Sequence, residues 1–175
     1  AEAGVKRAEL LMTGVFLARD LVNEPSNVIY PETLAKRAQE ALEPLGIKVT
    51  VYEEDEIREI GMHAFLSVGQ GSDKRPRLIV MEYKGDPESD KCTGLVGKGL
   101  TYDAGGYSLK PSDGMKTMNS DMAGAATVIG TMLTLGQIKP QTNVTGVIAA
   151  CENLISGSSY KPGDIIQSLA GKTIE

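Results

Sequence analysis

The chain has 175 residues and a mass of 18.6 kDa, which fits one domain or a large part of one. Hydrophobic residues at 41% can bury a core, and a formal charge of −5 argues against a nucleic-acid partner. Two cysteines with no Cys-x-x-Cys pair argue against a disulfide framework or a thiolate zinc site, and no apolar stretch near the start is long enough to cross a membrane, so we expect a cytoplasmic chain.

Two helices, a strand and a short acidic helix are predicted in the first part of the chain. Asn23-Glu24-Pro25 ends the first helix, and Pro31 begins the second because its fixed φ suits a first helical position. Gly61 closes the acidic helix. In chain order these elements cover residues 1–22, 31–46, 47–52 and 53–60.

The second part is predicted to hold three strands, a glycine-rich segment, a helix and a hairpin. The continuous apolar run at residues 78–81 is typical of a strand that is covered on both faces. The hairpin is expected to turn at Ala170-Gly171. The remaining elements are strands at 92–96 and 144–150, the glycine-rich segment 94–114, a helix of small residues at 121–135, and the hairpin at 165–174.

Alternating strands and helices predict an α/β fold with three layers, α/β/α, around a largely parallel mixed central sheet. The chain stops at Glu175, inside the expected second strand of the hairpin. We therefore expect residues 1–175 to be a fragment of a larger domain.

The glycine-rich segment carries the side chains most suited to chemistry. Lys98 and Asp103 project from the expected carboxyl end of a strand, where α/β sheets bind ligands. Lys110 follows seven residues later, and Asp121 begins the helix of small residues. Two carboxylates and two amines in a glycine-lined pocket would suit a divalent cation with oxygen ligands.

Each of these residues also has a purely structural interpretation. Lys98 and Asp103 could form a local ion pair, Asp121 could be only a helix N-cap, and Lys110 could be an exposed loop lysine. The only histidine, His63, lies in an apolar run and is predicted to be a packed core residue rather than a base.

Two rival sites are disfavoured by their spacing. A phosphate-binding P-loop needs glycine where Cys92 stands and serine or threonine where Gly99 stands. A serine hydrolase would need a Gly-x-Ser-x-Gly elbow, which the sequence lacks. A zinc site built from histidine and cysteine is excluded by the single histidine.

Residues 96–111 (VGKGLTYDAGGYSLKP) and 115–126 (MKTMNSDMAGAA) resemble the catalytic region of the leucyl (cytosol) aminopeptidases, the M17 metallopeptidase family. The resemblance extends over nearly the whole chain. Further signatures match at residues 23–27, 68–72, 151–153 and 161–164.

The resemblance implies a role for each candidate residue. Lys98, Asp103 and Asp121 would be metal ligands, with the Asp103 carboxylate bridging two divalent ions, zinc or manganese, and a neutral Lys98 amine on one of them. Lys110 would stay charged, polarise the scissile carbonyl and stabilise the oxyanion. Met118 would form a wall of the pocket for the first side chain of the substrate.

The family pattern also has parts that residues 1–175 do not contain. A motif of the form Asn-Thr-Asp-Ala-Glu-Gly-Arg, which completes the metal sites, would follow Glu175, and a separate N-terminal domain would precede the first helix. Residues 1–175 would thus be the N-terminal part of the catalytic domain. Asn119 and Ala123 stand where the family often has a basic residue and glycine, and neither is a ligand position.

Two functions follow as hypotheses. The first is a dinuclear metal-dependent aminopeptidase, hexameric by family, that removes leucine-like N-terminal residues from peptides; residues 1–175 alone would bind metal weakly and be inactive. The alternative is a fragment of a non-catalytic family member that acts as a scaffold or regulatory protein. Retention of Lys98, Asp103, Lys110 and Asp121 favours the first.

Overall fold

The computed structural model describes residues 2–175. Its helices are α1 (Glu2–Asn23), α2 (Pro31–Leu42), η1 (Glu43–Leu45), α3 (Glu54–Ile60), α4 (His63–Gly69), α5 (Ser112–Met115), η2 (Met118–Met122) and α6 (Ala123–Ile138), where η marks a 3₁₀ helix. Its strands are β1 (Lys48–Tyr52), β2 (Arg77–Lys84), β3 (Thr93–Asp103), β4 (Asn143–Asn153), β5 (Ile166–Gln167) and β6 (Thr173–Ile174).

Strands β1 to β4 form one mixed sheet in the order β1-β2-β4-β3. The predicted α/β class and the mixed sheet are confirmed, but the expectation of largely parallel pairing is wrong for these strands. Only β3 and β4 run parallel, whereas β1–β2 and β2–β4 are antiparallel. A strand that is covered on both faces is continuously apolar whether it pairs parallel or antiparallel. The pattern at residues 78–81 could therefore not reveal the direction in which its strand pairs.

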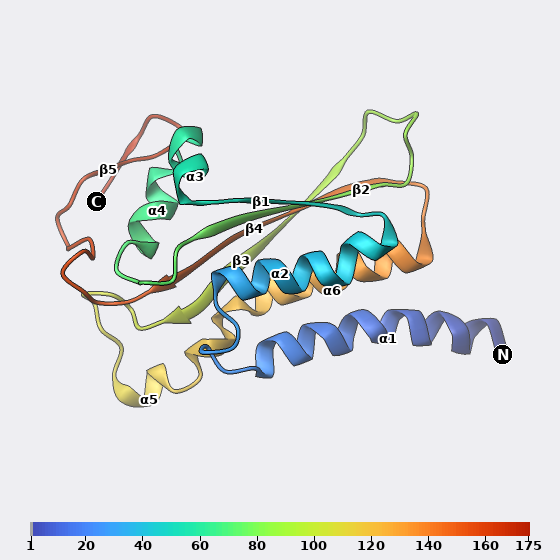
Figure 1. Cartoon of the computed structure of the whole chain (residues 1–175), viewed down its shortest axis with the longest axis horizontal. Coiled ribbons are helices and arrows are strands. Elements are labelled where there is room, and N and C mark those ends of the chain that lie inside the picture. The colour runs from blue at the N-terminus through green and yellow to red at the C-terminus, as the bar shows by residue number, and fades with distance from the viewer. Residues whose placement is uncertain (1) are drawn as a thin grey trace.

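Helices pack on both faces of this sheet. Ile79, Met81 and Ile148 belong to the core shared with α2 and α6, while Leu78 and Val80 belong to a smaller core with α3 and α4. Figure 1 shows α2 and α6 together along one side, and α3 and α4 at the end of the sheet where the C-terminal segment lies. Helix α1 packs on α6, because Gly14 and Gly130 leave no side chain between the two backbones.

Several predicted elements occur where the sequence placed them. α2 begins at Pro31, the left-handed Gly61 ends α3, and the small hairpin β5–β6 turns at a left-handed Gly171. Two predictions are wrong: β3 extends through the glycine-rich segment to Asp103, and His63 is exposed at the start of α4 rather than packed in the core. Helix α4 was not predicted from the sequence.

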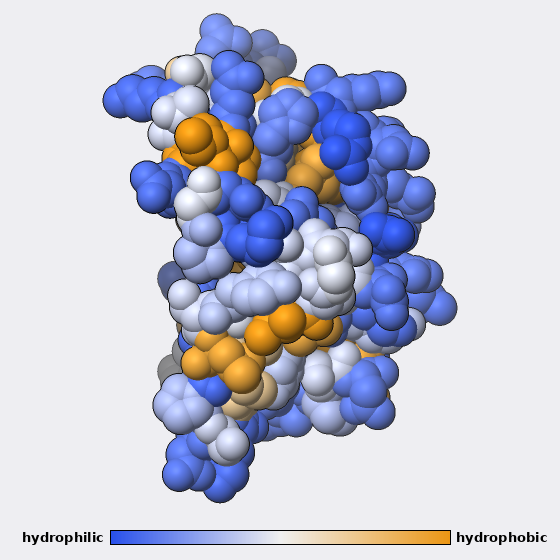
Figure 2. Space-filling view, turned by 90° about the vertical axis from the view of Figure 1, so that its left-hand side faces the viewer, coloured by the Kyte–Doolittle hydropathy of each residue, from blue (hydrophilic) through white to orange (hydrophobic). Residues whose placement is uncertain are grey.

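The end of the molecule that carries the C-terminal segment has a mixed surface. Figure 2 shows apolar side chains there in separate patches between polar ones. The exposed apolar side chains of the segment itself are Ile155, Ile165, Leu169 and Ile174. Across residues 2–175, no helix is both long enough and apolar enough to cross a membrane.

Candidate metal centre

A bulge in β3 brings Lys98 and Asp103 to the same face of the sheet. Residues five apart in a regular strand would point to opposite faces. The pairing of β3 with β4 skips Thr101, so that Lys98 lies beside Ala149 and Asp103 beside Asn153. Because these two β4 residues are four apart, their neighbours in β3 share one face. The bulge therefore makes a common site possible.

Asp121 reaches this site from the turn before α6. Gly97 allows the approach, because a Cβ atom there would lie 2.8 Å from the Cα of Ala125. The Lys98 Nζ lies 3.0 Å from Asp121 Oδ2, but the buried oxygen has no hydrogen-bond partner among the described residues, so this contact is an ion pair without hydrogen-bond geometry. A buried carboxylate oxygen left without a donor is suited to bind a cation.

Asp103 is held by three donors at the end of β3. Its Oδ2 lies 2.9 Å from Lys110 Nζ, and its Oδ1 accepts hydrogen bonds from Gly105 N at 2.9 Å and Asn153 Nδ2 at 2.8 Å. Burial alone would raise the pKa of Asp103, but the hydrogen bonds from Lys110, Gly105 and Asn153 outweigh it, and the pKa lies below its ordinary value. The Asp103 carboxylate is therefore ionised at neutral pH.

Lys110 stays protonated for the complementary reason. The hydrogen bond to Asp103 and the charge of that carboxylate raise the pKa of Lys110, and the charge of Asp121 raises it further. Asp121 thus acts on Lys110 across the site, which places the two ion pairs within electrostatic reach of one another. Two acid–amine ion pairs therefore lie near the carboxyl end of β3.

The structure decides between the alternatives that the sequence left open. Lys98 pairs with Asp121 rather than with Asp103. Asp121 is not an N-cap, because Met122 occupies that position of α6 and no side chain caps the helix. Lys110 is not a free loop lysine, because it is partly buried against Asp103. Met118 is half-buried one 3₁₀ turn before Asp121, a spacing that aligns the two side chains.

The donor set fits a divalent cation incompletely. Carboxylates and an amine suit zinc or manganese better than a soft metal. Within residues 2–175, however, no three histidine, cysteine, aspartate or glutamate side chains are grouped as metal ligands. Asp103, Asp121 and the Lys98 amine would therefore need further donors to complete a stable site.

Two features of the site were not predicted from the sequence. The Asn153 side chain bonds to Asp103, and the bulge at Thr101 aligns Asp103 with Lys98. An asparagine at the carboxyl end of a buried strand, next to other site-bearing strand ends, is a signal that could have drawn attention to Asn153. The bulge has no comparable sequence signal.

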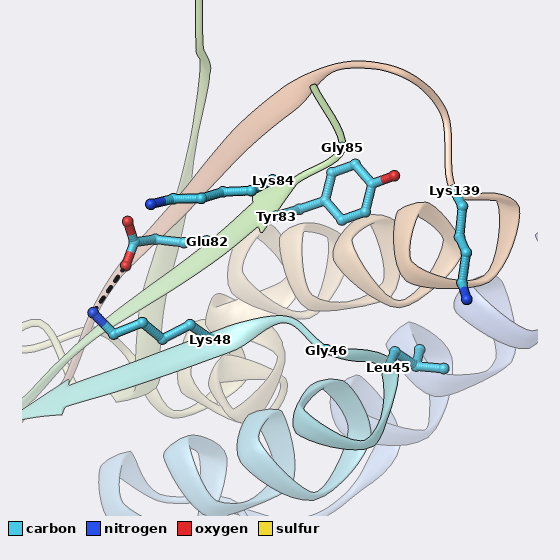
Figure 3. Close-up of a pocket in the computed structure, with 8 residues that line it drawn as sticks. All are labelled: Leu45, Gly46, Lys48, Glu82, Tyr83, Lys84, Gly85 and Lys139. Carbon is cyan, nitrogen blue, oxygen red and sulfur yellow. Dashed lines mark ion pairs between the residues drawn. The ribbon is translucent and has the colours of Figure 1, made fainter. Parts of the chain in front are cut away.

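The cavities differ in their relation to this site. One of about 460 Å³ begins at Gly105 and is lined by Tyr107, Tyr160 and Lys161 among others. Another of about 390 Å³, shown in Figure 3, lies where Lys84 of β2 pairs with Asn143, at the opposite end of β4 and roughly 30 Å away along the strand.

The lysines of the cavity in Figure 3 do not form a common site. Lys48 is paired with Glu82 at 3.3 Å. The Lys139 side chain points away from Lys48 and Lys84. The chemistry at the end of β3 therefore has no counterpart in this cavity.

Comparison with known proteins identifies the family. The model of the cytosol aminopeptidase family, catalytic domain, matches residues 16–175. This chain belongs to that family. The match confirms the family that the sequence predicted. The cytosol aminopeptidases are metallopeptidases.

Individual relatives agree with this assignment. A probable cytosol aminopeptidase of Treponema denticola is 57% identical over 175 residues, which is all of this chain and 37% of that protein. The cytosol aminopeptidase of Rickettsia prowazekii is 47% identical over 95% of this chain and 33% of its own length. The chain thus spans about a third of the length of these cytosol aminopeptidases.

A solved structure shares the fold. The bottromycin maturation enzyme BotP, in complex with Mn, superposes with a TM-score of 0.92 and 35% sequence identity, over 98% of this chain and 37% of that protein. A protein that was solved with bound manganese therefore has the same arrangement of strands and helices as this chain.

Proposed function

We propose that residues 1–175 form the N-terminal part of the catalytic domain of a dinuclear metal-dependent aminopeptidase that removes leucine-like N-terminal residues from peptides. The observation that supports this most strongly is the meeting of Lys98, Asp103, Lys110 and Asp121 at one end of β3. Family membership and a manganese-bound structural relative add support.

The residues divide into two functional groups, the metal ligands and the residues that act on the substrate. Asp103, Asp121 and a deprotonated Lys98 would hold two zinc or manganese ions, with Asp103 between them. The orphaned Asp121 Oδ2 beside the Lys98 amine is consistent with that ligand role. When bound, such ions supply Lewis acidity and an activated water.

Lys110 would act on the substrate itself. Its raised pKa keeps a positive charge beside the carboxylate of Asp103 at neutral pH. A charged donor at this position can polarise the scissile carbonyl and stabilise the negative charge that develops on its oxygen. Met118, aligned with Asp121 in η2, would line the pocket for the first side chain of the peptide.

Further properties follow from the family as parts of the same proposal. The remaining metal ligands would come from residues that this chain does not contain. The complete protein would be cytoplasmic and hexameric, with peptides as its substrates. The alternative, a scaffold or regulatory protein without catalysis, is disfavoured because Lys98, Asp103, Lys110 and Asp121 are all present.

A hybrid protein tests the catalytic proposal. Residues 1–175 replace the matching segment of the Treponema denticola relative, to which they are 57% identical, so that the other two thirds of that protein supply what this chain lacks. We expect the hybrid to hydrolyse L-leucine p-nitroanilide with added Mn²⁺. Replacing Lys110→Met in the hybrid should lower kcat by about 10²–10³-fold, the usual effect of losing one oxyanion donor.

The control is Lys116→Met, because Lys116 is exposed and pairs with the equally exposed Asp113, away from the proposed site. This variant should keep the activity of the hybrid. A folded hybrid without activity, or equal activity in the Lys110 variant, would refute the proposal and favour the non-catalytic alternative.

A further inference from the structure

Asn153 is bonded to Asp103 by its side chain and to the next residue, Ala104, by its backbone. Its Nδ2 donates to Asp103 Oδ1 at 2.8 Å, and its carbonyl oxygen accepts from Ala104 N at 2.9 Å. A Cβ atom at the left-handed Gly106 would lie 2.9 Å from the Asn153 Oδ1, so only glycine leaves this amide undisturbed. The end of β4 is therefore hydrogen-bonded to Asp103 and to the turn that follows it.

The three donors on Asp103 are not equivalent. Gly105 N and Asn153 Nδ2 both donate to Oδ1, the first from the backbone and the second from a short side chain. Lys110 meets Oδ2 from the end of a long, flexible side chain. If Lys110 turns to a substrate, the two donors on Oδ1 remain and still fix the plane of the carboxylate.

We propose that Asn153 is a positioning residue, which orients the Asp103 carboxylate for binding two divalent ions. This inference rests on the proposed function, because it concerns the same site. Partners that orient a metal ligand through a hydrogen bond typically change metal affinity by about 10–100-fold when they are removed. Asn153 meets that description through its single amide donor to Asp103.

The link between Asn153 and Asp103 is tested without any metal. A double-mutant cycle with Asn153→Ala and Asp103→Ala in this chain is followed by urea unfolding. We expect a coupling of roughly tenfold in the unfolding equilibrium constant, because the two side chains are in direct contact.

Asn143 provides the matched control cycle. It lies at the other end of β4, and its amide also makes several hydrogen bonds, to the carbonyl oxygens of Asp86, Ser89 and Lys91. Asn143→Ala and Asp103→Ala should be additive. Additive effects of Asn153→Ala and Asp103→Ala would overturn the inference.

The positioning role is tested by manganese affinity. Mn²⁺ binding to the hybrid protein is measured by electron paramagnetic resonance, with Asn153→Ala and with Asn153→Leu, which keeps the bulk of asparagine but has no donor. Both variants should bind Mn²⁺ about 10–100-fold more weakly, and Asn143→Ala should bind it unchanged.

The outcomes separate the two proposals. Folded Asn153 variants with unchanged Mn²⁺ affinity would overturn the positioning role even if the cycle shows coupling. A folded hybrid that binds no Mn²⁺ would overturn the metal site of the proposed function and with it the orientation of ions by Asn153. In that case, coupling in the double-mutant cycle would mean that the bond between Asn153 and Asp103 stabilises the fold but has no role in metal binding.

Discussion

At the end of β3, each acidic residue of the site is paired with a lysine. Asp103 and Lys110 shift the pKa of each other in opposite directions, and each keeps its charge at neutral pH. The sequence could identify these residue types, because lysine and aspartate in a glycine-rich strand end are unusual. It could not identify which acid pairs with which amine, since that depends on the bulge at Thr101 and on the position of η2.

The acid side of stability depends on Asp103. Its pKa is lower in the folded chain than its ordinary value, so it contributes stability above an unfolded pKa of about 3.9, and this contribution is lost as the pH falls through the folded pKa. Asp103→Asn should lower the free energy of unfolding at pH 7 by roughly 1.5 kcal/mol, the low end for hydrogen bonds to a charged group.

Urea unfolding of both proteins at pH 7 and pH 3 provides the measurement. The difference between wild type and Asp103→Asn should shrink at pH 3. The exposed Asp113, replaced by asparagine, serves as control and should have little effect at either pH. A difference that is as large at pH 3 as at pH 7 would show that the ionised Asp103 is not what stabilises the folded chain.

At the scale of elements, the sequence predicted local features better than pairing. Pro31 and Gly61 fix helix ends through their own backbone preferences, so those ends were predictable. β3 was predicted too short because glycine is a poor strand former by itself. In the fold, α6 can pack on β3 because Gly97 has no side chain. The sequence around Gly97 could not reveal this, because the contact is with a helix almost thirty residues later in the chain.

Gly97→Ala tests this packing. Its Cβ would lie 2.8 Å from Ala125 Cα and 2.8 Å from Gly124 O, both backbone atoms that cannot move alone. We expect a loss of about 1–3 kcal/mol in the free energy of unfolding, the usual cost of overpacking. Gly94→Ala in the same strand is the control, because no atom of residues 2–175 lies within 4 Å of its Cβ position. Equal effects of the two substitutions in urea unfolding would contradict this explanation.

At the scale of the whole molecule, the chain matches only part of the length of its cytosol aminopeptidase relatives. It spans 37% of the Treponema denticola relative. The family was predictable because the motif around Asp103 and Asp121 is long and distinctive. The strand order was not predictable: β3 lies at one edge of the sheet with an exposed Val96, whereas β4, which follows it in the chain, is internal.

The chain alone should therefore have little activity. By family resemblance it supplies three of five ligand side chains, so its metal affinity should be low. We expect hydrolysis of leucine amide by residues 1–175, with added Mn²⁺ or Zn²⁺, to be at least roughly 10³-fold slower than by the hybrid protein, since even one lost catalytic donor costs 10²–10³-fold. Turnover by the chain close to that of the hybrid would contradict this prediction.

Lys98, Asp103 and Asp121 should together hold a pair of metal ions. Anomalous diffraction from crystals of the hybrid protein grown with Mn²⁺ tests this most directly. We predict two anomalous peaks about 3.5–4 Å apart at the end of β3, with the Asp103 carboxylate touching both. Peaks elsewhere, or an Asp103 side chain that touches neither peak, would contradict the account.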